Sequence, residues 1–234
     1  MTGRQHIPSK PHSTGIKLYG KADENGFMYS FWIYRGKTDT IHDARPHQIV
    51  LDFANILNKT NKHIIYSDSY YGSSDLAKLL HDKGYNFVLS AKSNRPTWLF
   101  KDYLHKKLKK NEWNWRQNNN VIAVSFWDVK KCNFYSNCYS IKPINKSFEI
   151  VAQYNKYKGA LDQSDAHWNR YLQCQRKLKW TKAALFAFIK IALVNSWTIG
   201  KQGKYKSVLQ RQFLESLLQE FATKVQQNSK CFDN

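Results

Sequence analysis

The chain has 234 residues, 42% of them hydrophobic and 15% aromatic, and this composition excludes a chain that is disordered throughout. Its 37 Lys and Arg residues against 17 Asp and Glu residues give a net charge of +20, so a polyanion is the expected partner. The N-terminal segment has no apolar run, and the apolar stretch 183–199 is shorter than the roughly 20 residues of a membrane span, so no membrane partner is expected.

The positive charge is concentrated in the middle and C-terminal parts of the chain. From Arg95 to Lys206 there are 22 Lys or Arg residues and 6 Asp or Glu residues, so this segment alone has +16 of the net +20. Nucleic acid is the first expectation for such a surface. An anionic membrane surface and the ribosome are the alternatives.

The cysteines indicate a reducing compartment. Their spacing fits no zinc template and includes no CxxC, so we expect free thiols. The residues concerned are Cys132, Cys138, Cys174 and Cys231.

The first predicted element is a β-hairpin. The runs 14–22 and 27–35 are rich in β-forming residues, and the turn residues 23–26 separate them. Nearly every residue from Phe27 to Tyr34 is apolar or aromatic, which predicts a strand that is buried on both faces. A polar loop over 36–46 follows.

Helices then alternate with strands. Apolar residues on one face predict a helix over 47–57, and a second helix is predicted over 74–83. The second helix has a serine as its candidate cap, and Gly84 follows its end. Strands are predicted over 63–67 and 85–91.

Asp68 follows the strand 63–67, just before a predicted turn over 70–74. A hairpin followed by alternating helices and strands predicts a mixed sheet with helices packed on it. In such sheets, side chains with a chemical role lie at the carboxyl ends of strands, which favours Asp68 as a catalytic candidate. The alternative is that Asp68 is an ordinary turn or cap residue.

The segment 92–146 interrupts this alternation. A basic helix is predicted over 98–110, and short strands are predicted over 113–116 and 121–126. Aromatic residues interleave with lysines here, as in a groove that follows phosphates and stacks bases. For the tryptophans we favour the alternative of a small β-lobe with an aromatic core, because large aromatic side chains are usually buried.

Two long helices are predicted near the C-terminus. The first, over 182–199, is apolar enough to be a buried core helix. The second, over 205–226, has apolar residues repeating along one face.

Two aspartates, Asp162 and Asp165, lie three residues apart in a helical pattern, so they share one helix face. Together with Asp68 they could present three carboxylates to one or two Mg²⁺ ions, as in phosphoryl transfer on nucleic acids. An acidic centre within a basic chain suits that chemistry. Paired aspartates near a helix start also serve as dipole-complementing caps, and this alternative stays open.

Four motifs resemble, in this order, the piggyBac transposases and the domesticated genes derived from them: SDSYYGSSDLAKLL (67–80), SAKSNRP (90–96), YNKYKGALDQSDAHWNRY (154–171) and RKLKW (176–180). The N-terminal pattern GR…PSKP…GIKLY also fits, so the resemblance covers about residues 3–200. It implies an α/β fold: an RNase H-like mixed sheet with flanking helices, a β-rich insertion lobe and a helical C-terminal part. The implied divisions are residues 1–94, 95–150 and 151–234.

The resemblance also implies roles for individual residues. Members of the family use three aspartates and two Mg²⁺ (or Mn²⁺) ions for DNA strand transfer, which takes place in the nucleus. By motif match, Asp68 is the second of these aspartates, Asp162 is the third, and Asp165 is a further acidic residue near the metals. Trp180 matches a tryptophan near the DNA.

The basic clusters supply the other expected DNA contacts. They are Arg95, Lys106, Lys107, Lys109, Lys110, Lys130, Lys131, Lys156, Lys158, Arg176, Lys177 and Lys179.

The chain departs from the family pattern at the first catalytic aspartate. In the family this residue comes just before the segment that matches Thr2–Arg4, whereas here no Asp or Glu precedes Asp23. The first core strand is therefore expected to be missing, as are the N-terminal DNA-binding and dimerisation region and the C-terminal zinc module. Gly159-Ala160 also replaces the usual Gly-Gly before the third aspartate.

These departures predict a transposase-derived chain that binds DNA, holds Mg²⁺ weakly and does not cut DNA. A homodimer is one oligomeric state open to it. The alternatives are a domesticated, non-enzymatic nucleic-acid-binding protein and a basic RNA-binding or ribosome-associated protein.

Overall fold

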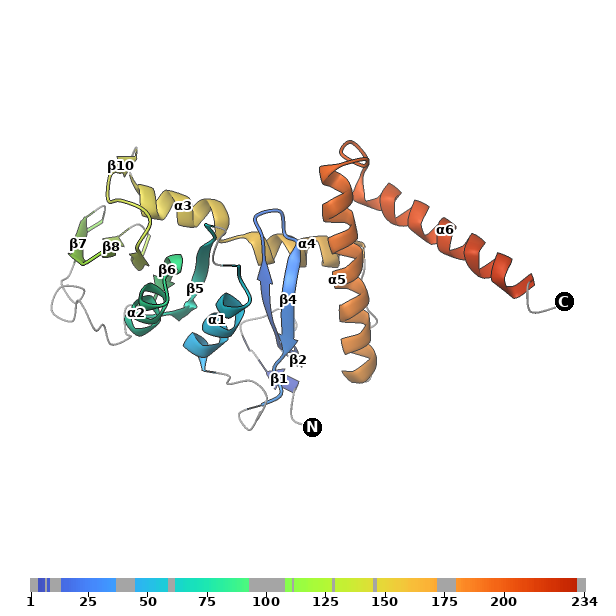
Figure 1. Ribbon diagram of the computed structural model, residues 1–234, viewed down its shortest axis with the longest axis horizontal. Coiled ribbons are helices and arrows are strands. Elements are labelled where there is room, and N and C mark those ends of the chain that lie inside the picture. The colour runs from blue at the N-terminus through green and yellow to red at the C-terminus, as the bar shows by residue number, and fades with distance from the viewer. Residues whose placement is uncertain are drawn as a thin grey trace. The chain divides into compact units, whose positions relative to one another are not determined.

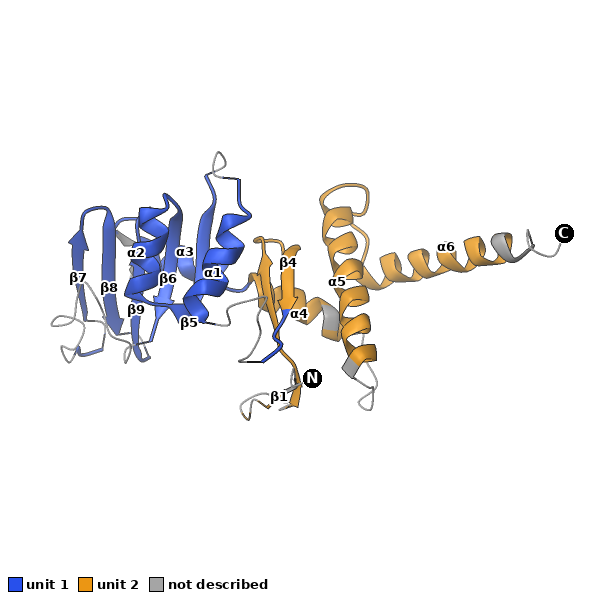
Figure 2. Ribbon diagram, turned by 60° about the horizontal axis from the view of Figure 1, so that its bottom comes forward, with its two compact units in different colours: residues 1–3, 33–159 blue, residues 4–32, 160–234 orange. Residues whose placement is uncertain are grey.

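The structure is a computed structural model that describes residues 4–6, 8, 14–36, 45–58, 62–92, 108–110, 112–127, 129–144, 147–171 and 180–230. The chain forms two compact units (Figure 2). Unit 1 consists of residues 33–159 with 1–3, and unit 2 consists of residues 4–32 and 160–234. The three-part division 1–94, 95–150 and 151–234 stays a prediction. The predicted basic helix over 98–110 lies outside the described residues except for its last three positions.

Unit 1 is built on a five-stranded mixed sheet with the strand order β5-β6-β9-β8-β7. The first two strands are parallel, and the other neighbours are antiparallel. The bounds are β5 Ile64–Gly72, β6 Asn86–Ala91, β7 Trp113–Asn118, β8 Val121–Trp127 and β9 Lys131–Ser136. A short antiparallel pair, β10 (Pro143–Ile144) and β11 (Ser147–Phe148), precedes the last helix of the unit.

The sequence did not predict β9, although the other four strands of this sheet were predicted. The reason lies in its polar residues. Asn133 is fully buried, and its side-chain oxygen accepts a hydrogen bond from the hydroxyl of Ser125 on β8 at 2.8 Å. A polar pair that satisfies itself can occupy a buried strand, but it hides the apolar pattern that identifies such a strand.

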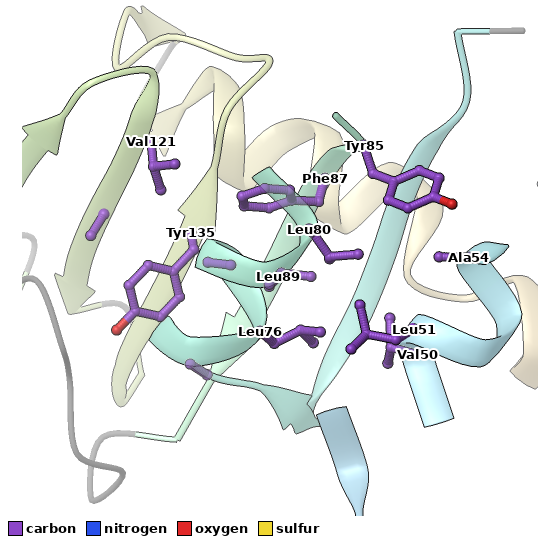
Figure 3. Close-up of a cluster of buried hydrophobic side chains, with 13 residues drawn as sticks. Val50, Leu51, Ala54, Leu76, Leu80, Tyr85, Phe87, Leu89, Val121 and Tyr135 are labelled. Atoms are coloured by element: carbon purple, nitrogen blue, oxygen red, sulfur yellow. The ribbon is translucent and has the colours of Figure 1, made fainter. Parts of the chain in front are cut away.

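Three helices pack on this sheet: α1 (Pro46–Asn55), α2 (Ser74–Asp82) and α3 (Glu149–Tyr157). The first two belong to one buried cluster, which Figure 3 shows around Leu76 and Phe87, and α3 belongs to a second cluster with other residues of the sheet. Each cluster lies on its own face of the sheet, because successive strand residues point to opposite faces.

The predicted boundaries of α2 are confirmed by its caps. The hydroxyl of Ser73 accepts a hydrogen bond from the backbone N–H of Leu76 at 3.1 Å, as expected of an N-cap. Gly84 follows the helix with φ +76°, the left-handed conformation that glycine adopts most easily.

Strand β5 is longer and less regular than predicted. Its parallel register with β6 is regular from Ile64 to Ser67 and resumes only where Gly72 pairs with Ala91. The predicted turn over 70–74 is therefore wrong for its first three residues, which continue the strand. A side chain at position 72 would overlap the carbonyl oxygen of Ser90, so only glycine allows the strands to rejoin there.

The described residues of unit 2 form two pairs of strands and three helices. The strands are β1 (Arg4–His6) with β2 (Thr14–Ile16), and β3 (Leu18–Ala22) with β4 (Met28–Ile33). The helices are α4 (Ala160–Tyr171), α5 (Trp180–Gln202) and α6 (Gln210–Lys230). All are labelled in Figure 1 except β3.

The predicted hairpin is present as β3 and β4. Residues 14–16, which were predicted to belong to its first strand, form β2 and pair with β1 instead. The turn of the hairpin is held by Asp23, whose Oδ1 accepts hydrogen bonds from the backbone N–H groups of Asn25 and Phe27 at 2.9 and 3.0 Å. The prediction that the second strand is buried on both faces is wrong. Met28 is buried, but Tyr29 is 63% exposed, because a two-stranded sheet offers its two faces unequal cover.

Helix α5 is joined to this hairpin by one asparagine. The Oδ1 atom of Asn195 accepts from the backbone N–H of Met28 at 2.8 Å, and its Nδ2 group donates to the carbonyl of the same residue at 2.9 Å. The rings of Phe31 and Phe188 also meet, with centroids 5.3 Å apart. The side chain of Asn195 thus makes the two backbone hydrogen bonds with Met28 that a neighbouring strand would otherwise make.

The prediction of a fully buried core helix over 182–199 is wrong in its burial. Val194 and Trp197 are buried, whereas Leu185 and Ile199 are 57% and 59% exposed. The segment Thr181–Gln202 is long and apolar enough to cross a membrane by composition, and 28% of its most apolar window is buried. The absence of a membrane partner therefore stays a prediction.

Helix α6 begins five residues later than the predicted position 205, because turns occupy the residues before it. Its first turns pack on α5, where the rings of Trp197 and Phe213 lie 5.6 Å apart. Farther along, α6 extends away from α5 (Figure 1). Leu218 and Val225 are there 68% and 67% exposed.

Candidate metal and nucleic-acid site

Asp68 lies on β5, at the first residue after the regular part of the β5–β6 register. Its side chain is exposed, and its Oδ1 accepts a hydrogen bond from the backbone N–H of Tyr70 at 2.8 Å. This bond fixes the direction of the carboxylate at the point where the strand leaves its neighbour. An exposed, oriented carboxylate fits a ligand of a hard cation such as Mg²⁺.

Several tyrosines surround this part of β5. Burial raises the pKa of Tyr71, and the negative charge of Asp68 raises it further, so the phenol stays neutral. On the same strand, the hydroxyl of Tyr66 lies 3.1 Å from that of Tyr139, and the ring of Tyr66 lies 4.9 Å from that of Tyr157. The sequence interpretation did not single out these tyrosines. Their positions in the sequence could have indicated a role, because Tyr66 directly precedes the motif with Asp68 and Tyr157 lies within the motif with Asp162.

Asp162 and Asp165 both lie on α4, and both are exposed. Between them, Ser164 is buried beneath the turn of the β3–β4 hairpin, where a side chain on Gly26 would come within 3.4 Å of its backbone nitrogen. Gly26 has φ +80°, so this turn requires glycine for its conformation. The hairpin thus supports the helix while both carboxylates face outward.

The candidate carboxylates belong to different compact units. Asp68 is in unit 1, whereas Asp162 and Asp165 are in unit 2. The structure does not determine the positions of the units relative to each other. Within the described part of the chain, no three His, Cys, Asp or Glu side chains form a group that could hold a metal ion. A shared metal site of Asp68 and Asp162 stays a prediction.

The structure brings four of the predicted DNA-contacting lysines together at one end of the sheet. The backbone N–H of Trp127 donates to the carbonyl of Glu112 at 3.0 Å, and Trp127 pairs with Lys131 across β8 and β9. This arrangement places Lys109 and Lys110, which precede β7, at the same end of the sheet as Lys130 and Lys131. Burial lowers the pKa of Lys131, and the other three lysines are exposed.

Two further predicted lysines, Lys156 and Lys158, are exposed at the C-terminal end of α3. Trp180 is the first residue of α5, and its side chain lies outside the described atoms. The remaining predicted contacts also lie outside the described residues: Arg95, Lys106, Lys107, Arg176, Lys177 and Lys179.

The expectation that the tryptophans of the β-lobe form its core is wrong for Trp113 and Trp115, which are 44% and 38% exposed on the edge strand β7. The ring of Trp113 packs on one side against Phe148, with centroids 4.7 Å apart. An edge strand has a neighbour on one side only, so its large side chains are covered less than those of a central strand.

The predicted free thiols are confirmed for Cys132 and Cys138.

Comparison with known proteins agrees with this architecture. The chain superposes on the piggyBac transposase of a cryo-EM synaptic complex with hairpin DNA, with a TM-score of 0.77 and 24% sequence identity. The match covers 92% of this chain and 48% of that one, so the chain spans about half the length of the solved transposase. The predicted α/β fold with a mixed sheet is confirmed, and it matches the fold of the superposed part of that transposase. No curated protein sequence matches the chain.

A family profile described as Transposase IS4 matches residues 1–197, which is most of the 234-residue chain. The match includes β5 with Asp68 and α4 with both of its candidate carboxylates. The chain belongs to the IS4 transposase family.

Proposed function

We propose that this chain is a piggyBac-type, transposase-derived protein that binds DNA and that, as these 234 residues alone, does not cut it. The observation that supports DNA binding most directly is a net charge of +20 on a transposase fold. Such a field attracts the phosphate backbone, which supplies most of the non-specific affinity for DNA. The solved relative is a complex with hairpin DNA, which supports DNA as the polyanion.

The metal proposed for this site is Mg²⁺, or Mn²⁺ in its place. Asp68 and Asp162 would hold it, with Asp165 close by. All three are exposed oxygen donors, the ligand type that these ions prefer. A bound ion of this kind polarises a phosphate and favours the ionised form of a water nucleophile. The chain's own lysines would hold the DNA backbone at the site.

The proposed inactivity rests on the ligand set. Asp68 and Asp162 match two of the three catalytic aspartates of the family, and they lie on two units. Catalytic residues that act as a unit lose most of the rate when one of them is absent. We therefore expect weak metal binding and no strand cleavage by these residues alone.

A plasmid-nicking assay tests this expectation. Supercoiled DNA incubated with the chain and Mg²⁺ or Mn²⁺ should stay supercoiled, as it does with the variant Asp68→Asn and with EDTA. Metal-dependent nicking that Asp68→Asn and Asp162→Asn each abolish would overturn the proposed inactivity. It would leave the proposal of DNA binding intact.

Competition binding separates DNA from RNA as the partner. A labelled duplex DNA bound to the chain should be displaced by unlabelled duplex DNA at lower concentration than by double-stranded RNA of the same length. Preferential displacement by RNA would favour the RNA-binding alternative.

Sedimentation of the free chain and its DNA complex tests the proposed homodimer, and imaging of a tagged chain tests the proposed nuclear location.

A further inference from the structure

We propose that Lys156 binds a DNA phosphate beside Asp68, and that Tyr157 and Tyr66 are positioning residues that hold its ammonium group there. This inference rests on the proposed function, because it names one part of the surface by which the chain would bind DNA. It is carried by contacts within unit 1 that join the end of α3 to the strand that bears Asp68.

The first observation is the spacing of Tyr66 and Asp68 along β5. Tyr66 and Asp68 are two residues apart on β5, so about 7 Å separates their backbones. The register of β5 with β6 is regular through Ser67, which places Tyr66 on the α3 side of the sheet with the cluster that includes Ile150. Asp68 is the next residue by alternation along that side.

The second contact makes the ring of Tyr66 a fixed support. Its hydroxyl lies 3.1 Å from the hydroxyl of Tyr139, so the two phenols are within hydrogen-bonding distance. Its ring meets the ring of Tyr157 at 4.9 Å between centroids, with an interplanar angle of 41°.

The third contact is a cation–π interaction. The Nζ atom of Lys156 lies 4.7 Å from the centroid of the Tyr157 ring. Adjacent helix residues do not face each other, so the lysine side chain has to bend over its neighbour to reach this ring. An ammonium group held in one place loses less conformational entropy when it binds a phosphate than one that moves freely.

The charges on α3 itself favour an anionic ligand at its C-terminal end. Lys156 is exposed, and the one acidic residue of α3, Glu149, lies at the opposite end of the helix. There its Oε2 atom accepts hydrogen bonds from the backbone N–H and the hydroxyl of Ser140. The neighbouring Lys158 donates to Asn155 at 2.8 Å, and its Nζ atom lies 6.0 Å from the centroid of the Tyr154 ring, a longer cation–π contact than that of Lys156.

The test is equilibrium binding of the whole chain to a short fluorescein-labelled duplex, measured by anisotropy between about 50 and 200 mM salt. Lys156→Gln should lower the affinity about threefold at the lower salt and make the log–log salt slope shallower by about 0.9. Lys78→Gln is the matched control. Lys78 is exposed on α2, on the opposite face of the sheet and paired with Asp82, so its loss should leave the slope unchanged.

Variants of Tyr157 separate positioning from charge. Tyr157→Leu removes no charge, so it should lower the affinity less than Lys156→Gln does, whereas Tyr157→Phe keeps the ring and should bind like the wild type. Tyr66→Leu should resemble Tyr157→Leu. The double variant Lys156→Gln/Tyr157→Leu should be no weaker than Lys156→Gln alone, because the ring acts only through this lysine.

Three results would overturn the inference: a Lys156→Gln slope equal to that of Lys78→Gln, wild-type binding by Tyr157→Leu, or additive losses in the double variant. Circular dichroism identifies a variant that fails to fold. If Tyr157→Leu fails to fold, the salt slope of Tyr157→Phe is compared with that of Lys156→Gln/Tyr157→Phe, and equal slopes would overturn the inference. A wild-type chain that binds no DNA would contradict the proposed function instead.

Discussion

At the scale of single residues, a few positions determine how the strand that bears Asp68 is shaped. Gly72 allows β5 to rejoin β6 after the irregular stretch, and Ser73 then caps α2. The carboxylate of Asp68 lies at the start of that stretch and is oriented by the backbone of Tyr70. Its geometry therefore depends on the residues that close the irregularity as well as on the strand that precedes it.

Gly72→Ala should destabilise unit 1. The added methyl group would overlap the carbonyl oxygen of Ser90, so the backbone has to shift, and overpacking of this kind costs about 1–3 kcal/mol. The urea midpoint of unfolding measures this loss. Gly15→Ala is the control, because nothing lies within 4 Å of a side chain placed there. Equal midpoints for the two variants would contradict the role assigned to Gly72.

The tyrosines near Asp68 predict loss of stability in alkaline solution. Tyr66 has a raised pKa in the folded chain, mainly through burial, whereas the unfolded phenol ionises near 10.0. Above that pH the folded state keeps a proton that the unfolded state has released, so the free energy of unfolding falls as pH rises. Thermal unfolding at pH 8 and at pH 10.5 measures this fall. It should be smaller in Tyr66→Phe, and an unchanged fall would contradict the assignment.

At the scale of elements, local patterns in the sequence predicted most helices and strands, because periodicity and caps are local properties. Helix α2 is an example, since Ser73 and Gly84 mark its two ends. The hydrophobic pattern did not predict the structure where burial depends on tertiary contacts. Strand β9 is buried through the pair of Ser125 and Asn133, and the cover over α5 depends on what packs against it, which its apolar composition does not reveal.

The link between α5 and the hairpin predicts a large effect from one polar residue. Asn195→Ala leaves the N–H and C=O groups of the buried Met28 without this partner, at a cost of about 1–3 kcal/mol for each buried group. Asn195→Asp keeps an acceptor and loses the donor, so its loss should be intermediate. Urea unfolding measures both variants. Ser196→Ala, on the exposed side of α5, is the control, and an equal loss there would argue against the link.

At the scale of the whole molecule, the sequence predicted the candidate carboxylates but not their spatial relation. Asp162 and Asp165 share α4 because a spacing of three residues always shares a helix face. Asp68 lies on a different unit, and no local pattern fixes the distance between units. The fold class was predictable because alternation of strands and helices limits the architectures, and the superposition on a transposase agrees with it.

The distribution of charge connects these scales. Lys109, Lys110 and Lys130 at one end of the sheet, and Lys156 and Lys158 at the end of α3, are exposed on unit 1, which also contains Asp68. Because these charges lie on folded elements, their contribution to DNA binding should depend on the fold, whereas binding by an unstructured basic chain would not. A long-range positive field and oriented local cations together support the proposal that the chain binds DNA without catalysis.

The most direct test of the central claim is the affinity of the chain for duplex DNA as a function of salt, with and without Mg²⁺. We expect binding that weakens by at least about a thousandfold between 50 and 200 mM salt if six or more phosphates are contacted. Beyond its general ionic effect, Mg²⁺ should leave the affinity unchanged, and EDTA should not release the DNA. Absence of binding at low salt, or binding that requires Mg²⁺, would contradict the account.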